Sequence, residues 1–253
     1  MTDAAVAALR AAGCVFAEDE AALLRAEAQD DQHLQLLLAE RVAGRPLEQV
    51  VGWAELEGVR VRMSPGVFVP RRRSALLVRL ATAAVRTGHE RVVDLCCGSG
   101  ALGAVLLTRH PHLDLHAADL DPAATACARS NLPPERVHDG DLYDALPHHL
   151  RGSVDVLVVN APYVPSGAIA TMPSEARDHE HHLALDGGAD GLDVQRRVIA
   201  SAPTWLAPGG LTVVETGRAQ ADTTAALMRS AGLEPRQHRA ADVDGCAVSG
   251  RQV

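Results

Sequence analysis

The chain has 253 residues, of which 47% are hydrophobic and 22% are charged, and its formal net charge is −8. These values are typical of a globular protein that buries one α/β core and carries a small additional module. No apolar run approaches the roughly 18 residues that would span a bilayer. The acidic balance disfavours a strongly basic surface for duplex nucleic acid, although it leaves room for a local basic patch.

Residues 3–44 carry leucine, valine and alanine at helical spacing, and Gly13 and Gly44 interrupt the pattern. We therefore expect a small helical domain over residues 1–50. The first three residues precede an alanine-rich amphipathic segment and lack the pattern of a secretory signal. This predicts a cytoplasmic protein that does not associate with membranes.

Residues 51–69 alternate between apolar and polar side chains around Gly58, which predicts a β-hairpin. We expect this hairpin to form a linker over residues 51–73. The linker ends in the basic run Arg71-Arg72-Arg73, in a chain whose basic side chains are all arginine. Such a run is either a solvated turn or a contact for a phosphate or an acidic partner.

From residue 74 to residue 253, predicted helices and strands alternate, which is typical of a parallel sheet with crossover helices. We expect seven strands, the last two forming an antiparallel pair. The predicted strands are 91–96, 114–118, 136–138, 154–159, 210–216, 234–239 and 244–250, and the predicted helices are 74–86, 101–109, 122–131, 191–205 and 218–231.

A glycine-rich turn follows the first of these strands. The stretch Asp94-Leu95-Cys96-Cys97-Gly98-Ser99-Gly100 leaves a strand and opens a helix, and from Gly98 onward it fits G-x-G-x-x-G, a pattern that dinucleotide-binding enzymes share. A carboxylate at Asp94 would repel a pyrophosphate, but it can order the loop or meet the ammonium group of an amino acid. The turn therefore favours S-adenosylmethionine over NAD.

Two more aspartates follow the next two predicted strands. Asp119 can accept hydrogen bonds from both hydroxyls of a ribose, whereas Asp121 is better explained as the N-cap of the helix that opens with Pro122. Asp141 either accepts from an adenine amino group or is an ordinary turn residue. With the seven strands, this set suits the Rossmann-like sheet of a class I S-adenosylmethionine-dependent methyltransferase. We expect the adjacent positions to contribute to the cofactor site as well, namely Cys96, Gly100, Leu120 and Leu142.

The segment Asn160-Ala161-Pro162-Tyr163 follows the apolar run 154–159, which reads as a buried parallel strand. Ligands of α/β sheets bind at the carboxyl ends of strands. The side-chain oxygen of Asn160 and the carbonyl of Ala161 can both accept from one substrate NH2 group and hold its nitrogen toward an electrophile. Tyr163 would then cover the planar substrate group. The alternative is a strand followed by a proline turn.

No metal site is expected. The five cysteines, Cys96 and Cys97 among them, are odd in number and lack paired metal-ligand spacing, so we predict free thiols that serve packing. The run Asp178-His179-Glu180-His181-His182 lies in a loop and lacks the helical H-E-x-x-H spacing. Glu180 is more plausibly a residue that orders the loop 164–190, which is long enough to act as a substrate-binding lid.

The chain resembles the protein-(glutamine-N5) methyltransferases, which methylate the glutamine of a Gly-Gly-Gln motif in peptide release factors. By this resemblance Asn160 and the Ala161 carbonyl hold the substrate amide, Asn160 also contacts the cofactor, and Phe68, Val69 and Pro70 line the cofactor pocket. The resemblance covers roughly residues 40–253, and it implies that the helical domain over residues 1–50 recognises the substrate. The stretches that carry it are Gly52-Trp53-Ala54-Glu55-Leu56, Pro65-Gly66-Val67-Phe68-Val69-Pro70-Arg71, Asp94 to Gly100, Asn160 to Tyr163, His179 to Asp193, and Val213-Val214-Glu215-Thr216-Gly217.

The chain departs from that family at two informative positions. Ala161 replaces the proline of the usual Asn-Pro-Pro-Tyr, which frees a dihedral at an entropic cost of up to about 1 kcal/mol but keeps the carbonyl acceptor. The run Arg72-Arg73-Ser74-Ala75 stands where the family has Pro-Glu-Thr-Glu, so an acidic pair is lost.

The sequence thus predicts S-adenosylmethionine-dependent methylation of a glutamine side chain in a protein, with a peptide release factor as the candidate partner. A second hypothesis is N-methylation of an exocyclic amine of adenine or cytosine in nucleic acid, because that chemistry uses the same tetrapeptide. The acidic charge makes a nucleic-acid partner the weaker choice. A third is a cofactor-binding protein that has lost catalysis.

Overall fold

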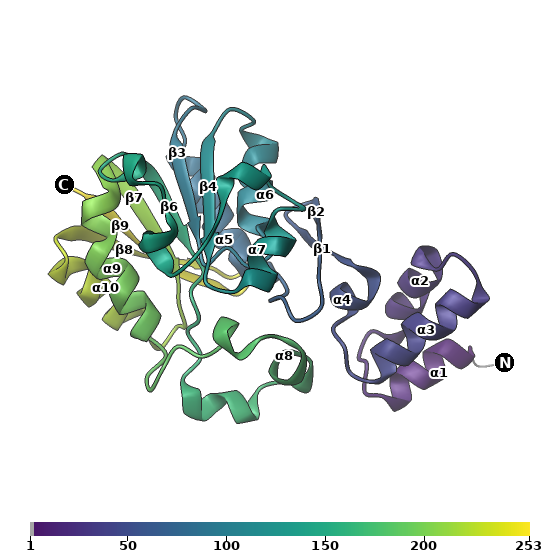
Figure 1. Cartoon of the computed structure of the whole chain (residues 1–253). Coiled ribbons are helices and arrows are strands. Elements are labelled where there is room, and N and C mark those ends of the chain that lie inside the picture. The colour runs from purple at the N-terminus through teal and green to yellow at the C-terminus, as the bar shows by residue number, and fades with distance from the viewer. Residues whose placement is uncertain (1–2) are drawn as a thin grey trace.

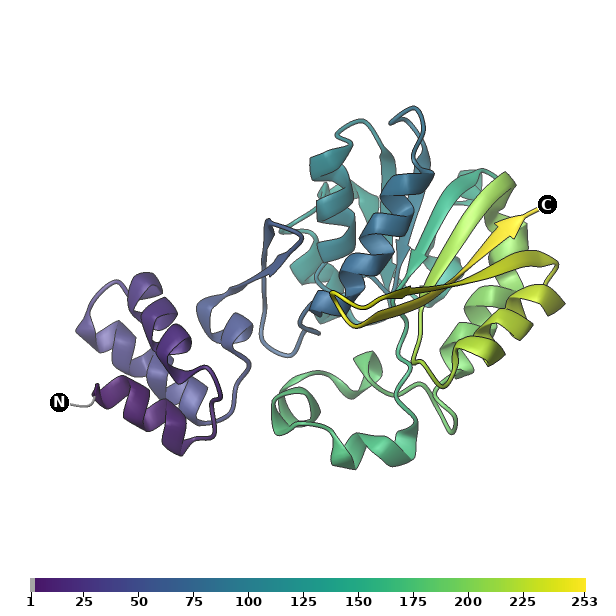
Figure 2. The same cartoon turned by 180° about the vertical axis from the view of Figure 1, so that it is seen from behind.

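The structure, a computed structural model, describes residues 3–253, so Met1 and Thr2 at the start of the expected helical domain lie outside it. Figure 1 shows a central sheet with helices on both faces and a group of N-terminal helices to one side. The hairpin of β1 (Trp53–Leu56) and β2 (Val59–Arg62) lies between these two parts. Figure 2 shows the same arrangement from behind.

Four helices form the N-terminal group: α1 (Ala4–Ala11), α2 (Ala17–Glu27), α3 (Asp31–Val42) and α4 (Leu47–Val51). Their apolar side chains, including the fully buried Leu9 and Leu24, form a core of their own. The helices predicted over residues 3–44 are confirmed. The sequence did not predict α4, because five residues are too few to show helical periodicity.

A buried ion pair holds these helices together and connects them to a distant segment. Arg41 of α3 pairs with Glu20 of α2 at 2.6 Å and with Glu175 of α8 (Ser174–His179) at 2.7 Å. The side chains of Arg41 and Glu20 are only 5% and 11% exposed. The N-terminal helices are therefore linked electrostatically to the segment that follows β6 (Val154–Val159).

We expect Arg41→Ala to destabilise the protein by about 3–5 kcal/mol, because it leaves a buried carboxylate at Glu20 without a partner. Chemical denaturation measures this loss. Arg10→Ala is the matched control, since Arg10 and Glu18 form an exposed pair of a kind that contributes at most about 1 kcal/mol. Equal losses in the two variants would contradict a stabilising role for the buried pair.

The sheet has seven strands in the order β5-β4-β3-β6-β7-β9-β8. Neighbours from β5 to β7 are parallel, and β9 is antiparallel to both β7 and β8. This confirms the predicted seven-stranded α/β sheet with an antiparallel end. The remaining strands are β3 (Arg91–Leu95), β4 (Asp114–Asp119), β5 (Val137–Asp139), β7 (Leu206–Glu215), β8 (Leu233–Ala240) and β9 (Gly245–Gln252).

Strand β7 begins four residues earlier than predicted. Pro208 and Gly209 interrupt the apolar pattern, and proline normally argues against a central strand. The structure accommodates them in an irregularity of β7: Val154 pairs with Leu206 and Val156 with Leu211, so β7 advances five residues where β6 advances two. The irregularity thus falls between the two pairs and leaves the rest of the parallel ladder regular.

Helices cover both faces of the sheet. Val156 and Val158 of β6 point into the core on the face covered by α5 (Ala75–Ala84), α6 (Ala101–Arg109) and α7 (Pro122–Ala128), whereas Leu157 and Val159 point into the opposite core with α9 (Asp193–Trp205) and α10 (Ala221–Ser230). This alternation explains the unbroken apolar run of β6. No helix within residues 3–253 has the length and apolar character needed to cross a membrane.

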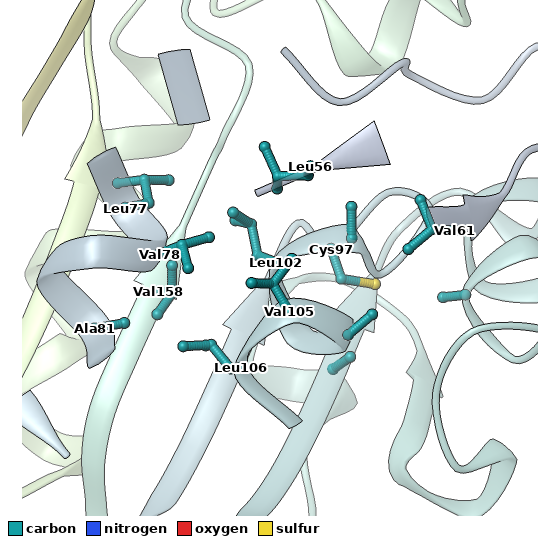
Figure 3. Packing of buried hydrophobic residues seen from close by; sticks show 14 of the residues in the cluster. Leu56, Val61, Leu77, Val78, Ala81, Cys97, Leu102, Val105, Leu106 and Val158 are labelled. Atoms are coloured by element: carbon teal, nitrogen blue, oxygen red, sulfur yellow. The ribbon is translucent and has the colours of Figure 1, made fainter. Parts of the chain in front are cut away.

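The hairpin packs on the first of these cores. Figure 3 shows Leu56 of β1 and Val61 of β2 beside Leu102 of α6 and Cys97, in the same apolar layer as Val105. The chain that leaves β2 then brings Phe68, Pro70 and Arg71 to the carboxyl ends of the parallel strands. A short 3-10 turn, η1 (Arg72–Ser74), then leads into α5.

Residues 164–190, which we call the cap segment, contain short helices rather than an open loop. They are η5 (Ser166–Thr171), α8 and η6 (His182–Ala184), and Figures 1 and 2 show this segment below the sheet, on the side toward the N-terminal helices. The Gln49 side chain donates to the carbonyl of His179 at 3.2 Å. Further short 3-10 turns lie elsewhere, namely η2 (Pro134–Arg136), η3 (Leu142–Ala145) and η4 (His148–Leu150).

Candidate active site

The turn between β3 and α6 adopts a backbone that glycine favours. Gly98 and Gly100 have φ values of 56° and 76°, and Cys96 shares the left-handed region at 60°. A Cβ at Gly100 would also lie 2.8 Å from a terminal methyl of Leu132, so the backbone conformation favours glycine here and a larger residue would displace that side chain. At Gly98 a Cβ would meet no atom within 4 Å, and its open side lines a cavity.

Asp119, at the end of β4, holds this turn in place. One of its carboxylate oxygens accepts from the Gly98 N–H at 2.8 Å and the other from the Asp121 N–H at 2.9 Å. Asp121 caps α7 through the Ala123 N–H, with Pro122 as the first helical residue, as predicted. Burial raises the pKa of Asp119. A carboxylate in this position can accept further hydrogen bonds, since each oxygen has two lone pairs.

The structure places Asp94 beneath the glycine turn and outside the cavity. It is fully buried, one oxygen accepts from the Gly103 N–H of α6 at 3.0 Å, and the other has no hydrogen-bond partner among the described residues. This contact ties the end of β3 to the first turn of α6, the two elements that flank the glycine turn. Burial raises the pKa of Asp94 from 3.8 to about 8.

We expect Asp94→Asn to stabilise the cofactor-free protein at high pH. The folded protein binds a proton at Asp94 more tightly than the unfolded chain does, so its stability falls as the pH rises from the unfolded pKa of 3.8 to about 8. Asparagine mimics the protonated carboxyl and does not titrate. One pKa unit corresponds to about 1.4 kcal/mol, so even half of this shift gives a gain of about 3 kcal/mol at about pH 9 and almost none at about pH 4. Thermal unfolding at both pH values measures the gain, and a gain independent of pH would contradict the buried titration.

The carboxyl ends of β3, β4 and β6 open into a cavity of about 1340 Å³, counting the space continuous with solvent. Most of the residues predicted for the site line this cavity, whereas Val69, Asp94 and Gly100 lie behind its walls. The predicted residues that line it are Phe68, Pro70, Cys96, Gly98, Asp119, Leu120, Asp141, Leu142, Asn160, Ala161, Pro162 and Tyr163.

Asn160 and Tyr163 are both hydrogen-bonded to groups from other elements. The Asn160 Nδ2 group donates to Ser74 Oγ at 3.3 Å, and the Tyr163 hydroxyl donates to Glu215 Oε1 at 3.0 Å. Within residues 3–253, Oδ1 of Asn160 accepts no hydrogen bond. Burial and the neighbouring carboxylate of Glu215 raise the pKa of Tyr163, so the phenol remains protonated and can donate. Ala161 is buried at the cavity wall.

Several residues that line the cavity or lie directly behind its wall were not predicted as site residues. Glu215, at the end of β7, is buried and accepts from both Ser74 and Tyr163. Arg73 lies 3.4 Å from its carboxylate. Arg197 of α9 pairs with Asp141 at 2.7 Å. The sequence feature that could have identified Glu215 as a site residue is its position at the carboxyl end of a predicted strand.

The arginine run before α5 contacts acidic groups of the chain itself. Arg71 pairs with Glu180 of the cap segment at 2.6 Å, and the same carboxylate oxygen accepts from the Val69 N–H at 3.2 Å. Glu180 therefore ties the cap segment to the cavity rim, as a loop-ordering residue would. Residues 3–253 contain no group of three or more side chains arranged to hold a metal ion. Burial raises the thiol pKa of Cys96 and Cys97, and both are unpaired.

The cavity fits an adenosyl amino-acid ligand. Asp119 and Asp141 place carboxylates at the ends of neighbouring strands, where they are able to accept hydrogen bonds from hydroxyl or amino groups of a ligand. Phe68 and Leu142 provide apolar walls, and the open backbone of Gly98 admits a close ligand. This sheet order and this cavity define a class I methyltransferase.

Comparison with known proteins identifies the family. A family model described as "Methyltransferase small domain" matches residues 58–179. The chain is 36% identical over 245 residues to a release factor glutamine methyltransferase of Bradyrhizobium diazoefficiens, covering 92% of this chain and 81% of that protein. The chain belongs to the release factor glutamine methyltransferase family.

Two further similarities bear on fold and on substrate. A methyltransferase structure from Pyrococcus furiosus has a TM-score of 0.57 at 13% identity, with 88% of this chain and 98% of that chain covered, and supports the fold alone. A relative from Streptomyces pristinaespiralis is named 4-amino-L-phenylalanine/4-methylamino-L-phenylalanine methyltransferase. It is 38% identical over 221 residues, with 83% of this chain and 75% of that protein covered.

Proposed function

We propose that this protein catalyses S-adenosylmethionine-dependent N5-methylation of a glutamine side chain in a protein, and that its substrate is the Gly-Gly-Gln motif of a peptide release factor. The observation that supports this proposal most is the position of Asn160. Its side chain lines the cavity, its Nδ2 group donates to Ser74, and its Oδ1 atom is free to accept a hydrogen bond. Release factors act on ribosomes, so the proposal also implies a cytoplasmic location.

The cofactor would be held by groups that the cavity brings together. Asp119 would accept from the ribose hydroxyls, Asp141 from the adenine amino group, and Phe68 would pack on the adenosyl part, with Gly98 and Leu142 beside it. S-adenosylmethionine, when bound, supplies a methyl group on a positively charged sulfur that departs as a neutral thioether.

The chain's own contribution is orientation. An amide nitrogen is a weak nucleophile because its lone pair is delocalised. By accepting one N–H at Asn160 Oδ1 and the other at the Ala161 carbonyl, the site would direct that lone pair along a single line. Tyr163 would cover the amide plane. The nitrogen gains a methyl group and releases one proton to solvent, so positioning rather than a strong base supplies the rate.

The N-terminal helices and the cap segment would recognise the protein substrate. Arg41 and Gln49 connect the two through Glu175 and the His179 carbonyl. Residues of the cap segment, including Met172 and Leu183, line the cavity. A substrate that binds between these parts would place one side chain in the cavity, and we infer that residues 1–50 are the recognition domain.

Mass spectrometry of a purified release factor tests this proposal. Incubation with enzyme and S-adenosylmethionine should add one methyl group to the Gly-Gly-Gln peptide. A release factor with asparagine in place of that glutamine is the matched control and should stay unmodified, because its shorter side chain cannot reach the clamp. An unmodified glutamine in the natural release factor would refute the substrate assignment.

A rival substrate is an aromatic amine, such as 4-aminophenylalanine or the exocyclic amine of a nucleic-acid base. The Streptomyces pristinaespiralis relative favours the amino acid, and so does Arg73, a cation at the cavity that could bind its carboxylate. Transfer of a labelled methyl group into the protein, RNA or small-molecule fraction of a lysate separates these cases. Label in no fraction, together with measured cofactor binding, would support a protein that has lost catalysis.

A further inference from the structure

A series of hydrogen bonds, which we call the relay, connects Asn160 through Ser74 to the buried carboxylate of Glu215 at the end of the neighbouring strand. Asn160 Nδ2 donates to Ser74 Oγ at 3.3 Å, and Ser74 Oγ donates to Glu215 Oε2 at 2.7 Å. The Tyr163 hydroxyl donates to the second oxygen, Glu215 Oε1, at 3.0 Å. Ser74 and Glu215 are each only 2% exposed, so water does not compete for these bonds.

The Glu215 carboxylate fixes the direction of every hydrogen bond in the relay. An ionised carboxylate only accepts, so the Ser74 proton must point toward Glu215. The Ser74 oxygen is then left as an acceptor, and Asn160 must turn its NH2 group toward it. The carbonyl oxygen of Asn160 consequently faces away from Ser74. Burial raises the pKa of Glu215, but the hydrogen bond from Ser74, the positive charge of Arg73 Nε at 3.4 Å from Oε1 and the hydrogen bond from Tyr163 all oppose that shift and favour the ionised carboxylate.

We propose that Glu215 is a positioning residue, which orients the Asn160 amide through Ser74 so that its oxygen meets the substrate N–H, and which holds Tyr163 in place as the wall. Glu215 does not touch the reacting atoms in this role. The identity of the substrate amide rests on the proposed function. The directions of the hydrogen bonds from Asn160 to Glu215 are a property of the protein itself.

The substitution Glu215→Gln reverses the relay with little change in shape. Tyr163 donates to Oε1 and the positive charge of Arg73 lies 3.4 Å from it, so the glutamine oxygen stays on that side and its NH2 group faces Ser74. Ser74 must then accept, its proton turns to Asn160, and the Asn160 NH2 group faces the substrate NH2 group. Two donors then oppose each other. We expect kcat to fall at least about 100-fold. The cofactor Kd should change less than about threefold, because Glu215 is not a lining residue of the cavity.

Three comparisons separate positioning from a general structural effect. The fall in kcat should exceed the rise in KM for a long peptide, since most of the peptide's binding lies outside the amide. Ser74→Ala should cause a similar fall, and the double variant should be no more than about twofold worse than either single variant, because both act through one relay. Glu90→Gln is the matched control. Glu90 is also a buried carboxylate, but it accepts hydrogen bonds from the backbone of residues 86–88 before β3. It therefore lies at the amino ends of the strands, away from the cavity at their carboxyl ends. This control should retain wild-type kcat within about twofold.

A second readout does not depend on turnover. In the 15N spectrum of the wild-type protein, one proton of the Asn160 side-chain amide should exchange slowly because it is bonded to Ser74. This protection should be lost in Glu215→Gln and in Ser74→Ala, with thermal unfolding confirming that each variant folds. Absence of product from the wild-type enzyme would refute the proposed function without touching the relay. Unchanged Asn160 protection, or a Glu215→Gln kcat within about threefold of wild type, would overturn the role of Glu215.

Discussion

Replacing Asn160 by alanine is expected to abolish methyl transfer while cofactor binding persists. The substitution removes the only side-chain acceptor of the proposed amide clamp, and losses of at least about 10³-fold in kcat are typical when a group that orients or stabilises the reacting centre is deleted. Single-turnover assays with a Gly-Gly-Gln peptide measure the rate. Calorimetry with S-adenosylmethionine measures the binding that should remain within about threefold.

A distant amide provides the control for this substitution. Gln237, on β8, donates to the exposed Asp222 and lies far from the cavity, so Gln237→Ala should leave turnover within about twofold. Turnover by Asn160→Ala at the level of the control would show that the clamp is not the source of the rate.

Replacing Asp119 by alanine is expected to weaken cofactor binding by at least about 100-fold. The carboxylate would accept from the ribose, and hydrogen bonds to charged groups contribute about 1.5–3 kcal/mol each. Its loss also frees the Gly98 N–H that it now holds at 2.8 Å, so the glycine turn loses its anchor. Calorimetric titration with S-adenosylmethionine measures the change in Kd.

Asp114, at the opposite end of the same strand, is the matched control. It pairs with Arg136 and Arg91 and does not line the cavity. Asp114→Ala should change the Kd for S-adenosylmethionine less than about threefold, even if it lowers the melting temperature. If both variants weaken binding alike, the effect of Asp119 is a general loss of stability and the ribose contact is wrong.

The sheet and the position of the site were predictable because both depend on local patterns. A strand buried on two faces is apolar throughout, so residues 154–159 identified β6 and placed Asn160 at its carboxyl end. Asp121 and Pro122 likewise identified the start of α7. The start of β7 was mispredicted because Pro208 and Gly209 interrupt the apolar pattern, and only the pairing of Leu206 with Val154 shows that the strand extends through them.

The support of the site was not predictable because it depends on contacts between distant segments. Ser74 and Glu215 are 141 residues apart in the chain, yet they form a 2.7 Å hydrogen bond. The family resemblance included Glu215 without giving it a role, since only the adjacency of β6 and β7 brings it to Asn160 and Tyr163. The short helices of the cap segment had a local signal, as Pro165 and Pro173 directly precede two of them, but their contacts with Arg41 and Gln49 had none.

A crystal structure of the enzyme with S-adenosylhomocysteine and a Gly-Gly-Gln peptide tests the amide clamp most directly. The glutamine nitrogen should lie within about 3.2 Å of both Asn160 Oδ1 and the Ala161 carbonyl, with Tyr163 over the amide plane and the sulfur in line beyond the nitrogen. A glutamine side chain outside the cavity, or one whose nitrogen faces neither acceptor while the ligand is bound, would contradict methylation at this strand end.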